Sequence, residues 1–319
     1  MISRIIIPAV LMFAVTISTA QTKRIEFTAP EMYPEGVVYD ANAGLFYVSS
    51  VTTGTIGKVD ASGNYSVVYA DSLLKSTFGM KIAPAQRKLW VCVSDPNHSK
   101  YRDSSTYKKM ARLIAIDLTT GTKVNDIDLA SLYGGKHFAN DLDIDADGNL
   151  YITDSYSPVI YKVDNSGKAS VFAQSEWFAS AGVGLNGIVA HPGGYLLVAN
   201  NGAGALLKVD LRDPQRVGRV MIDQFFPGGD GLLLDGRDLL LVQNKGVNKV
   251  FRLASADNWQ RAAVVAATKM EDRFSYPSTL TKRNQEIWVM NAKLHELSDS
   301  TQAPSRKFSI QQAILQPVK

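Results

Sequence analysis

Hydrophobic and polar positions alternate over short stretches from residue 24 onward, and this period of two residues indicates β-strands. Six times along the chain, a short strand opens on a small or polar motif and is followed by a turn and a more apolar strand. The opening motifs begin at Glu35, Phe78, Asn140, Asn186, Asp230 and Ser278. The second strands cover residues 45–48, 89–91, 150–152, 196–198, 239–242 and 287–289. Turn residues such as Gly, Asn and Pro separate the two strands, which predicts a hairpin in each repeat.

Third and fourth strands follow most hairpins, so each repeat predicts a four-stranded propeller blade. Residues 95–112 form a polar insertion after the second strand of the second blade, and we expect them to act as a lid over one mouth of the central channel. The sixth repeat is one strand short, and residues 24–27 can supply that strand. The sequence therefore predicts an all-β, six-bladed β-propeller that is closed by pairing of its N- and C-terminal strands.

The N-terminus has the pattern of a secretory signal peptide. Arg4 precedes an apolar run that is too short to span a bilayer, and small residues at 18–20 predict cleavage after Ala20. We expect residues 21–319 to form a single domain and the protein to be exported to the periplasm or the extracellular space. Cys92 is the only cysteine, so it cannot form an intramolecular disulfide, and its apolar neighbours predict a buried thiol.

Composition excludes several classes of protein. With 45% hydrophobic and 20% charged residues the chain has enough apolar material for a core and is not disordered. The formal net charge of +4 gives no strong basic excess, which argues against nucleic acid as a partner. There is no Gly-x-Ser-x-Gly elbow and no phosphate-binding loop, so neither a serine hydrolase nor a nucleotide hydrolase is indicated.

The six strand openings become neighbours in a propeller, because the first strand of every blade lines the central channel. Together they offer carboxylate, amide and hydroxyl oxygens and one aromatic ring, without His or Cys. Such a donor set favours a hard divalent cation, with Ca²⁺ first and Mg²⁺ or Mn²⁺ next, whereas Zn²⁺ usually draws His or thiolate and remains the last alternative. The competing interpretation is that Asn-Gly and Asp-Gly only start the strands.

These motifs resemble the senescence marker protein/gluconolactonase family of six-bladed propellers over essentially the whole mature chain. Glu35-Gly36 is similar to that family's first acidic motif, Asn186-Gly187 to its central Asn-Gly and Asp230-Gly231 to its Asp-Gly. The resemblance implies Glu35, Asn186 and Asp230 as metal ligands, Asp230 as general base, and Asn140 as a substrate-contacting amide. The same ring positions are also similar to the catalytic calcium site of paraoxonases.

The chain departs from the family where sugar lactonases carry Arg-Pro before the third-blade Asn-Asp. It has His137-Phe138-Ala139 there, which favours a substrate more apolar than a sugar lactone. Phe78 on the ring points the same way, and Ser278 completes the predicted substrate-binding set with Asn140. His137 lies close to Asn140 in sequence and is the second candidate for the general acid or base.

A calcium-loop-like run at Asp143 to Gly148 is not an EF-hand, because its flanks predict strands and a hairpin turn rather than helices. Asp141 and Asp143 could instead help to bind a second cation.

The sequence favours a metal-dependent hydrolase that opens a lactone or related ester, acting as a monomer on a small molecule and without a membrane partner after signal cleavage. The alternative is a non-catalytic propeller that binds a small ligand, a glycan or a protein.

Overall fold

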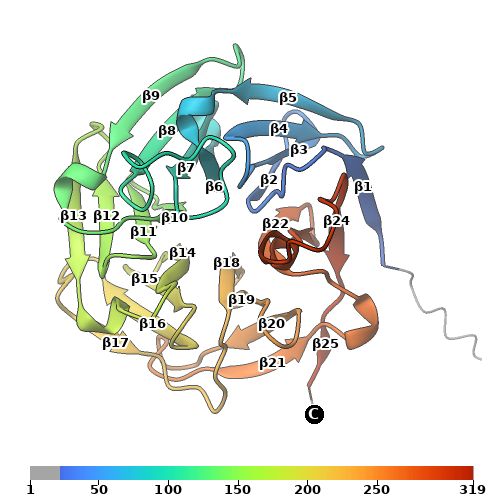
Figure 1. The fold of residues 1–319 in the computed structure, drawn as a ribbon. Helices are drawn as coiled ribbons and strands as arrows, with labels where there is room; N and C mark the ends of the chain where they lie inside the picture. Colours follow the sequence, from blue (N-terminus) through green and yellow to red (C-terminus); the bar gives the residue numbers. More distant parts are fainter. Residues whose placement is uncertain (1–21, 319) are drawn as a thin grey trace, which may run out of the picture.

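The computed structural model describes residues 22–318, and the predicted signal peptide lies outside this range. Six antiparallel sheets surround a central axis like the blades of a propeller (Figure 1). Blades 1 to 3 consist of β2 (Val37–Asp40), β3 (Leu45–Val48), β4 (Thr55–Val59) and β5 (Tyr65–Ala70); β6 (Ser76–Ala83), β7 (Lys88–Ser94), β8 (Ala111–Asp117) and β9 (Lys123–Asp128); and β10 (Ala139–Ile144), β11 (Leu150–Asp154), β12 (Val159–Val163) and β13 (Ala169–Gln174).

Blades 4 and 5 consist of β14 (Leu185–His191), β15 (Tyr195–Asn200), β16 (Ala205–Asp210) and β17 (Val217–Arg219); and β18 (Gly229–Asp235), β19 (Asp238–Gln243), β20 (Lys249–Ala254) and β21 (Ala263–Ala267). Blade 6 contains β22 (Pro277–Arg283), β23 (Glu286–Asn291) and β24 (Lys307–Ala313). Short 3₁₀ helices lie in the connections: η1 (Ser72–Leu74), η2 (Pro84–Gln86), η3 (Ala130–Leu132), η4 (Glu176–Phe178), η5 (Met270–Asp272) and η6 (Leu294–Ser298). The six-bladed architecture predicted from the sequence is confirmed.

The ring closes as the sequence predicted. Strand β1 (Arg24–Thr28) joins blade 6 by antiparallel pairing with β24, from Arg24 opposite Gln311 to Thr28 opposite Lys307. A short strand that the sequence pattern does not reveal, β25 (Gln316–Pro317), adds a fifth member to blade 5 next to β21 (Figure 1). Both ends of the described chain are therefore paired to a blade, which leaves fewer exposed strand edges.

The innermost strands are β2, β6, β10, β14, β18 and β22 (Figure 1). Five of them change register with their partner at the same place, and each interruption encloses one of the ring positions: Phe78, Asn140, Asn186, Asp230 and Ser278. A bulge of this kind breaks the regular alternation of side chains and re-aims the extra residue. The recurring small-residue motif therefore marks the point at which each inner strand bends at the hub.

Glycine is required where neighbouring blades touch at the hub. A Cβ atom on Gly187 would lie 2.2 Å from the backbone oxygen of Asp230, and one on Gly36 would lie 2.3 Å from that of Phe78. Both distances are too short for any side chain, so the glycines after Glu35 and Asn186 allow the close approach of consecutive blades. In blade 3 the equivalent position is occupied by Asp141, which brings an additional carboxylate to the hub.

The core is divided among the spaces between blades, where buried aromatic and branched side chains from adjacent sheets pack together. Phe46 and Trp288, for example, join blades 1 and 6 with their ring centroids 5.8 Å apart. Cys92 is free and buried, as predicted. No helix within residues 22–318 has the length and apolar character needed to cross a membrane.

Candidate functional site

The three predicted metal ligands are all buried at the same end of the hub. Glu35 lies two residues before the start of β2, Asn186 lies in β14 and Asp230 lies in β18. No more than 6% of any of the three is exposed. The Ser278 hydroxyl of blade 6 donates a 2.5 Å hydrogen bond to the Glu35 backbone oxygen and so fixes the segment that carries this carboxylate. Asn244, which follows β19, donates from Nδ2 to Asp230 Oδ2 at 2.5 Å.

Burial and mutual repulsion disfavour the charged forms of these acids. The pKa of Glu35 is raised well above its ordinary value by desolvation and then by the carboxyls of Asp230 and Asp141. Desolvation and Asp141 also raise the pKa of Asp230 well above normal, although the amides of Asn186 and Asn244 oppose the shift. Three acids from three blades are therefore close enough to repel one another, and a positive charge among them would relieve that repulsion.

Asp141 is balanced in part by a lysine from the neighbouring blade. Lys81 Nζ lies 3.2 Å from Asp143 Oδ1, and its attraction also lowers the pKa of Asp141, which desolvation nevertheless raises to about 6. Desolvation disfavours the Lys81 charge, but Asp143 and Asp141 outweigh it and raise the pKa of the ammonium. This ion pair gives Asp143 a counter-charge and leaves Glu35, Asp230 and Asp141 without a full counter-charge.

We expect Lys81→Met to destabilise the protein by about 2 kcal/mol, because it leaves the Asp143 carboxylate without its counter-charge. The cost is smaller than for a fully buried ion pair, since the Lys81–Asp143 pair is partly exposed. The Lys81 side chain is 23% exposed. Urea unfolding of the variant beside Lys58→Met, an exposed lysine without an ion pair among the described residues, measures the difference. Equal stability of the two variants would show that Lys81 does not balance the hub.

One observation indicates that the hub residues could bind a divalent cation. Four buried side-chain oxygens at the hub have no hydrogen-bond partner: Glu35 Oε2, Asn186 Oδ1, Asp230 Oδ1 and Asn244 Oδ1. Unpartnered buried oxygens are costly unless something binds them, and carboxylate and amide oxygens are the ligands that Ca²⁺ takes. Within residues 22–318 no three His, Cys, Asp or Glu side chains are close enough to hold a metal by themselves. A site here therefore depends on the two amide oxygens.

The predicted substrate-binding residues lie around this cluster. Asn140 is buried in β10 and donates from Nδ2 to Ser155 Oγ at 2.8 Å. Phe78 is buried in β6 and packs edge-on against Phe138, with ring centroids 4.6 Å apart. The Ser278 hydroxyl, in contrast, is engaged by the backbone of Glu35.

His137 is buried and lies two residues before β10 of the third blade. Its Nδ1 lies 2.9 Å from Asp154 Oδ2 and 3.2 Å from the Tyr161 hydroxyl, and Tyr161 also donates to Asp154. The Asp154 carboxylate fixes the orientation of the imidazole through Nδ1, which leaves Nε2 as the ring nitrogen for any proton transfer.

Sequence reasoning did not assign Asn244 or Lys81 to the main site, and it considered Asp141 only as the neighbour of Asn140 in a paraoxonase-like pair and as a ligand of a second cation. Asn244 follows a second strand, and its amide reaches Asp230 only because β18 and β19 pair in the observed register. A further signal for Asp141 is that a carboxylate stands where blades 1, 2, 4 and 5 carry glycine and blade 6 carries Thr279.

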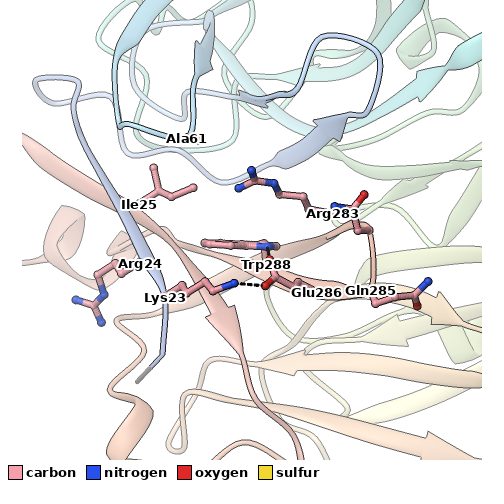
Figure 2. Close-up of a pocket in the computed structure, with 9 residues that line it drawn as sticks. Lys23, Arg24, Ile25, Ala61, Arg283, Gln285, Glu286 and Trp288 are labelled. Atoms are coloured by element: carbon pink, nitrogen blue, oxygen red, sulfur yellow. Dashed lines mark hydrogen bonds and ion pairs between the residues drawn. The ribbon is translucent and has the colours of Figure 1, made fainter. Parts of the chain in front are cut away.

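The surface offers grooves elsewhere, such as one of about 560 Å³ lined by Lys23, Arg24, Arg283 and Trp288 (Figure 2). The turn between β22 and β23 borders it, so it lies at the opposite end of these strands from Ser278. It contains none of the hub residues.

Comparison with solved structures shows the fold class, a six-bladed β-propeller. The major allergen Mala s 1 of Malassezia sympodialis is similar with a TM-score of 0.73 and 18% identity, over 93% of this chain and 97% of that one. A luciferin-regenerating enzyme aligns with a TM-score of 0.64 and 15% identity, again over 93% and 97%. Regucalcin from Agrobacterium tumefaciens, a calcium-binding protein, aligns with a TM-score of 0.59 and 16% identity over 90% and 92%. No family model matches the chain, and no curated protein does.

Proposed function

We propose that the protein is a divalent-metal-dependent hydrolase that opens a lactone or related ester at the hub of the propeller. The observation that carries the proposal is the set of four unpartnered, buried oxygens contributed by blades 1, 4 and 5. A propeller used only as a scaffold gains nothing from such a costly cluster. The similarity in fold to a calcium-binding protein and to an enzyme also supports a metal-dependent catalytic function.

Glu35, Asn186 and Asp230 would hold the cation, with the Asn244 oxygen as a further donor. A bound divalent cation would supply Lewis-acid polarisation of the substrate carbonyl and would lower the pKa of an attacking water. Ca²⁺ is favoured because every candidate ligand is a carboxylate or amide oxygen.

Asp230 is the candidate base because its two oxygens have different environments. Asn244 holds Oδ2, while Oδ1 has no partner and can accept the proton of a water molecule. The water oxygen adds to the carbonyl carbon, the ring C–O bond breaks, and the leaving oxygen takes up a proton to give the hydroxy acid. Asn140 and Phe78 would contact the substrate beside this point. His137 Nε2 is the alternative proton acceptor.

The function is tested by hydrolysis of δ-gluconolactone, γ-butyrolactone and the aromatic lactone phthalide with purified mature protein. After chelation, activity is expected to disappear and to return with Ca²⁺ more fully than with Mg²⁺, Mn²⁺ or Zn²⁺. Phthalide should be preferred, since the basic sugar contact of the related lactonases is replaced here by His137, Phe138 and Ala139. The absence of both metal-dependent hydrolysis and cation binding by calorimetry would favour the non-catalytic alternative.

A further inference from the structure

The loop between β7 and β8 crosses three blades at the end of the hub that carries Glu35. Residues 95–110 contain no strand, as expected for the predicted insertion. The Lys100 amide donates to the Thr52 backbone oxygen of blade 1 at 2.9 Å, and Lys75 Nζ binds Asp103 at 2.8 Å. The loop is therefore tied down on both sides, which is what a fixed wall of a binding site requires.

Lys108 lies where this loop meets blade 3. Its backbone N–H donates to the Asp95 oxygen at 2.8 Å, and its backbone oxygen accepts from the His137 N–H at 2.8 Å. The residue adopts a left-handed conformation with φ of 56°, which is uncommon for a side chain other than Gly, Asn or Asp. Two backbone hydrogen bonds thus hold Lys108 in a strained backbone conformation. They fix the position of its Cα atom, from which the half-buried side chain extends.

The Lys108 ammonium has no acidic partner within the described range 22–318, unlike two other lysines that contact or belong to the loop. Lys75 pairs with Asp103 and Lys100 pairs with Glu31. Lys109 is exposed and donates to the Ser104 backbone oxygen at 3.1 Å. Lys108 Nζ instead lies over the rings of Tyr107 and Tyr156, at 5.0 and 5.7 Å from their centroids. It is therefore a cation that is positioned but not neutralised.

A continuous aromatic wall connects this cation to the hub. Tyr156 packs against Phe138 with ring centroids 5.4 Å apart, and Phe138 packs against the hub residue Phe78 at 4.6 Å. Both contacts are edge-on, which is a favoured geometry for aromatic rings. The wall begins beside the candidate cation site and ends beneath Lys108. Phe78 and Phe138 are buried and Tyr156 is partly exposed, so the most accessible part of the wall lies beside the Lys108 ammonium.

From this arrangement we propose that Lys108 is a specificity-determining residue and that the substrate carries a carboxylate on a flat, apolar body. The inference rests on the proposed lactonase site and names its substrate class. The ester carbonyl would lie at the hub, the ring system along Phe78, Phe138 and Tyr156, and the carboxylate at the Lys108 ammonium. Attraction between the carboxylate and the Lys108 ammonium would fix the orientation of the substrate.

Binding of two non-hydrolysable ketones tests the proposal without depending on turnover. The calcium-loaded protein is titrated calorimetrically with 1-indanone and with 1-indanone-5-carboxylate, which replace the ring oxygen of the corresponding lactones by carbon. We expect the carboxylate to bind about tenfold more tightly than the neutral ketone, as for one charge-assisted contact. Lys108→Met should abolish this preference, while Lys109→Met, the exposed neighbour, should keep it. Lys108→Arg should retain most of it.

Persistence of the preference in Lys108→Met, its equal loss in Lys109→Met, or no binding of either ketone would overturn the proposal. Unchanged thermal unfolding and Ca²⁺ affinity show that the Lys108 variants are intact. A Lys108-dependent preference without lactone hydrolysis would reject the catalytic function while preserving the binding site. Metal-dependent hydrolysis without the preference would reject the role of Lys108 while preserving the catalytic function.

Discussion

Asp230→Asn is expected to lower kcat/KM for the best lactone by at least about 10³-fold, because it removes the proposed base and one charged ligand in a single change. The substitution keeps the shape of the side chain, and Asn244 still lies beside it. The rate is measured at saturating Ca²⁺, so that weakened cation binding does not by itself account for the loss.

An exposed acid of the same type provides the control for this variant. Asp213→Asn lies in the loop between β16 and β17 and should leave the rate unchanged. If Asp230→Asn retains activity within about tenfold while His137→Gln loses it, the proton acceptor is His137 rather than Asp230. Full activity in both variants would contradict the proposed mechanism.

The architecture could be predicted because its determinants are local. Alternating strands and turn residues define each hairpin within about ten residues, and repetition then specifies the propeller. The closure by β1 followed from counting strands in the last blade. Strand β25 did not, since it consists of only two residues and its pairing with β21 is decided by where the chain end lies after the ring has formed.

Only those site residues that occupy equivalent positions in the repeats could be predicted from the sequence. The bulges place Asn140, Asn186 and Asp230 at equivalent points, so one motif in the sequence locates all three. Partners between blades were not accessible in this way. Lys81 and Asp143 lie on different blades, and the distance between their charges depends on how two sheets pack.

The orientation of His137 illustrates the same limit. Its position before Asn140 suggested a residue at the channel mouth, but Asp154 and Tyr161 from other strands of its blade engage Nδ1. Sequence spacing gave the location of the imidazole along the chain, whereas side chains distant in sequence set the direction of its nitrogens. The aromatic wall beneath Lys108 depends in the same way on contacts between blades 2 and 3.

Glu35→Gln is expected to change cation affinity and cation-free stability in opposite directions. Replacing the carboxylate by an amide removes a charged ligand, so Ca²⁺ affinity measured by calorimetry should fall by about 100-fold or more. Without the cation, the same change removes one of the three mutually repelling acids, whose burial raises the pKa of Glu35 well above normal. The free energy of unfolding of the chelated protein should therefore rise, by about 1–2 kcal/mol.

Urea unfolding with Ca²⁺ and with chelator separates these two effects. Wild type should be stabilised by about 2.7 kcal/mol when the free cation reaches one hundred times its dissociation constant, whereas Glu35→Gln should gain almost nothing at that concentration. Glu26→Gln, an exposed acid in β1, should behave as wild type in both conditions. A Glu35→Gln protein that binds Ca²⁺ normally would show that the Glu35 carboxylate does not bind the cation. One that is less stable than wild type under chelation would show that this carboxylate does not repel Asp230 and Asp141. The opposite signs are informative because a merely misfolded variant loses affinity and stability together.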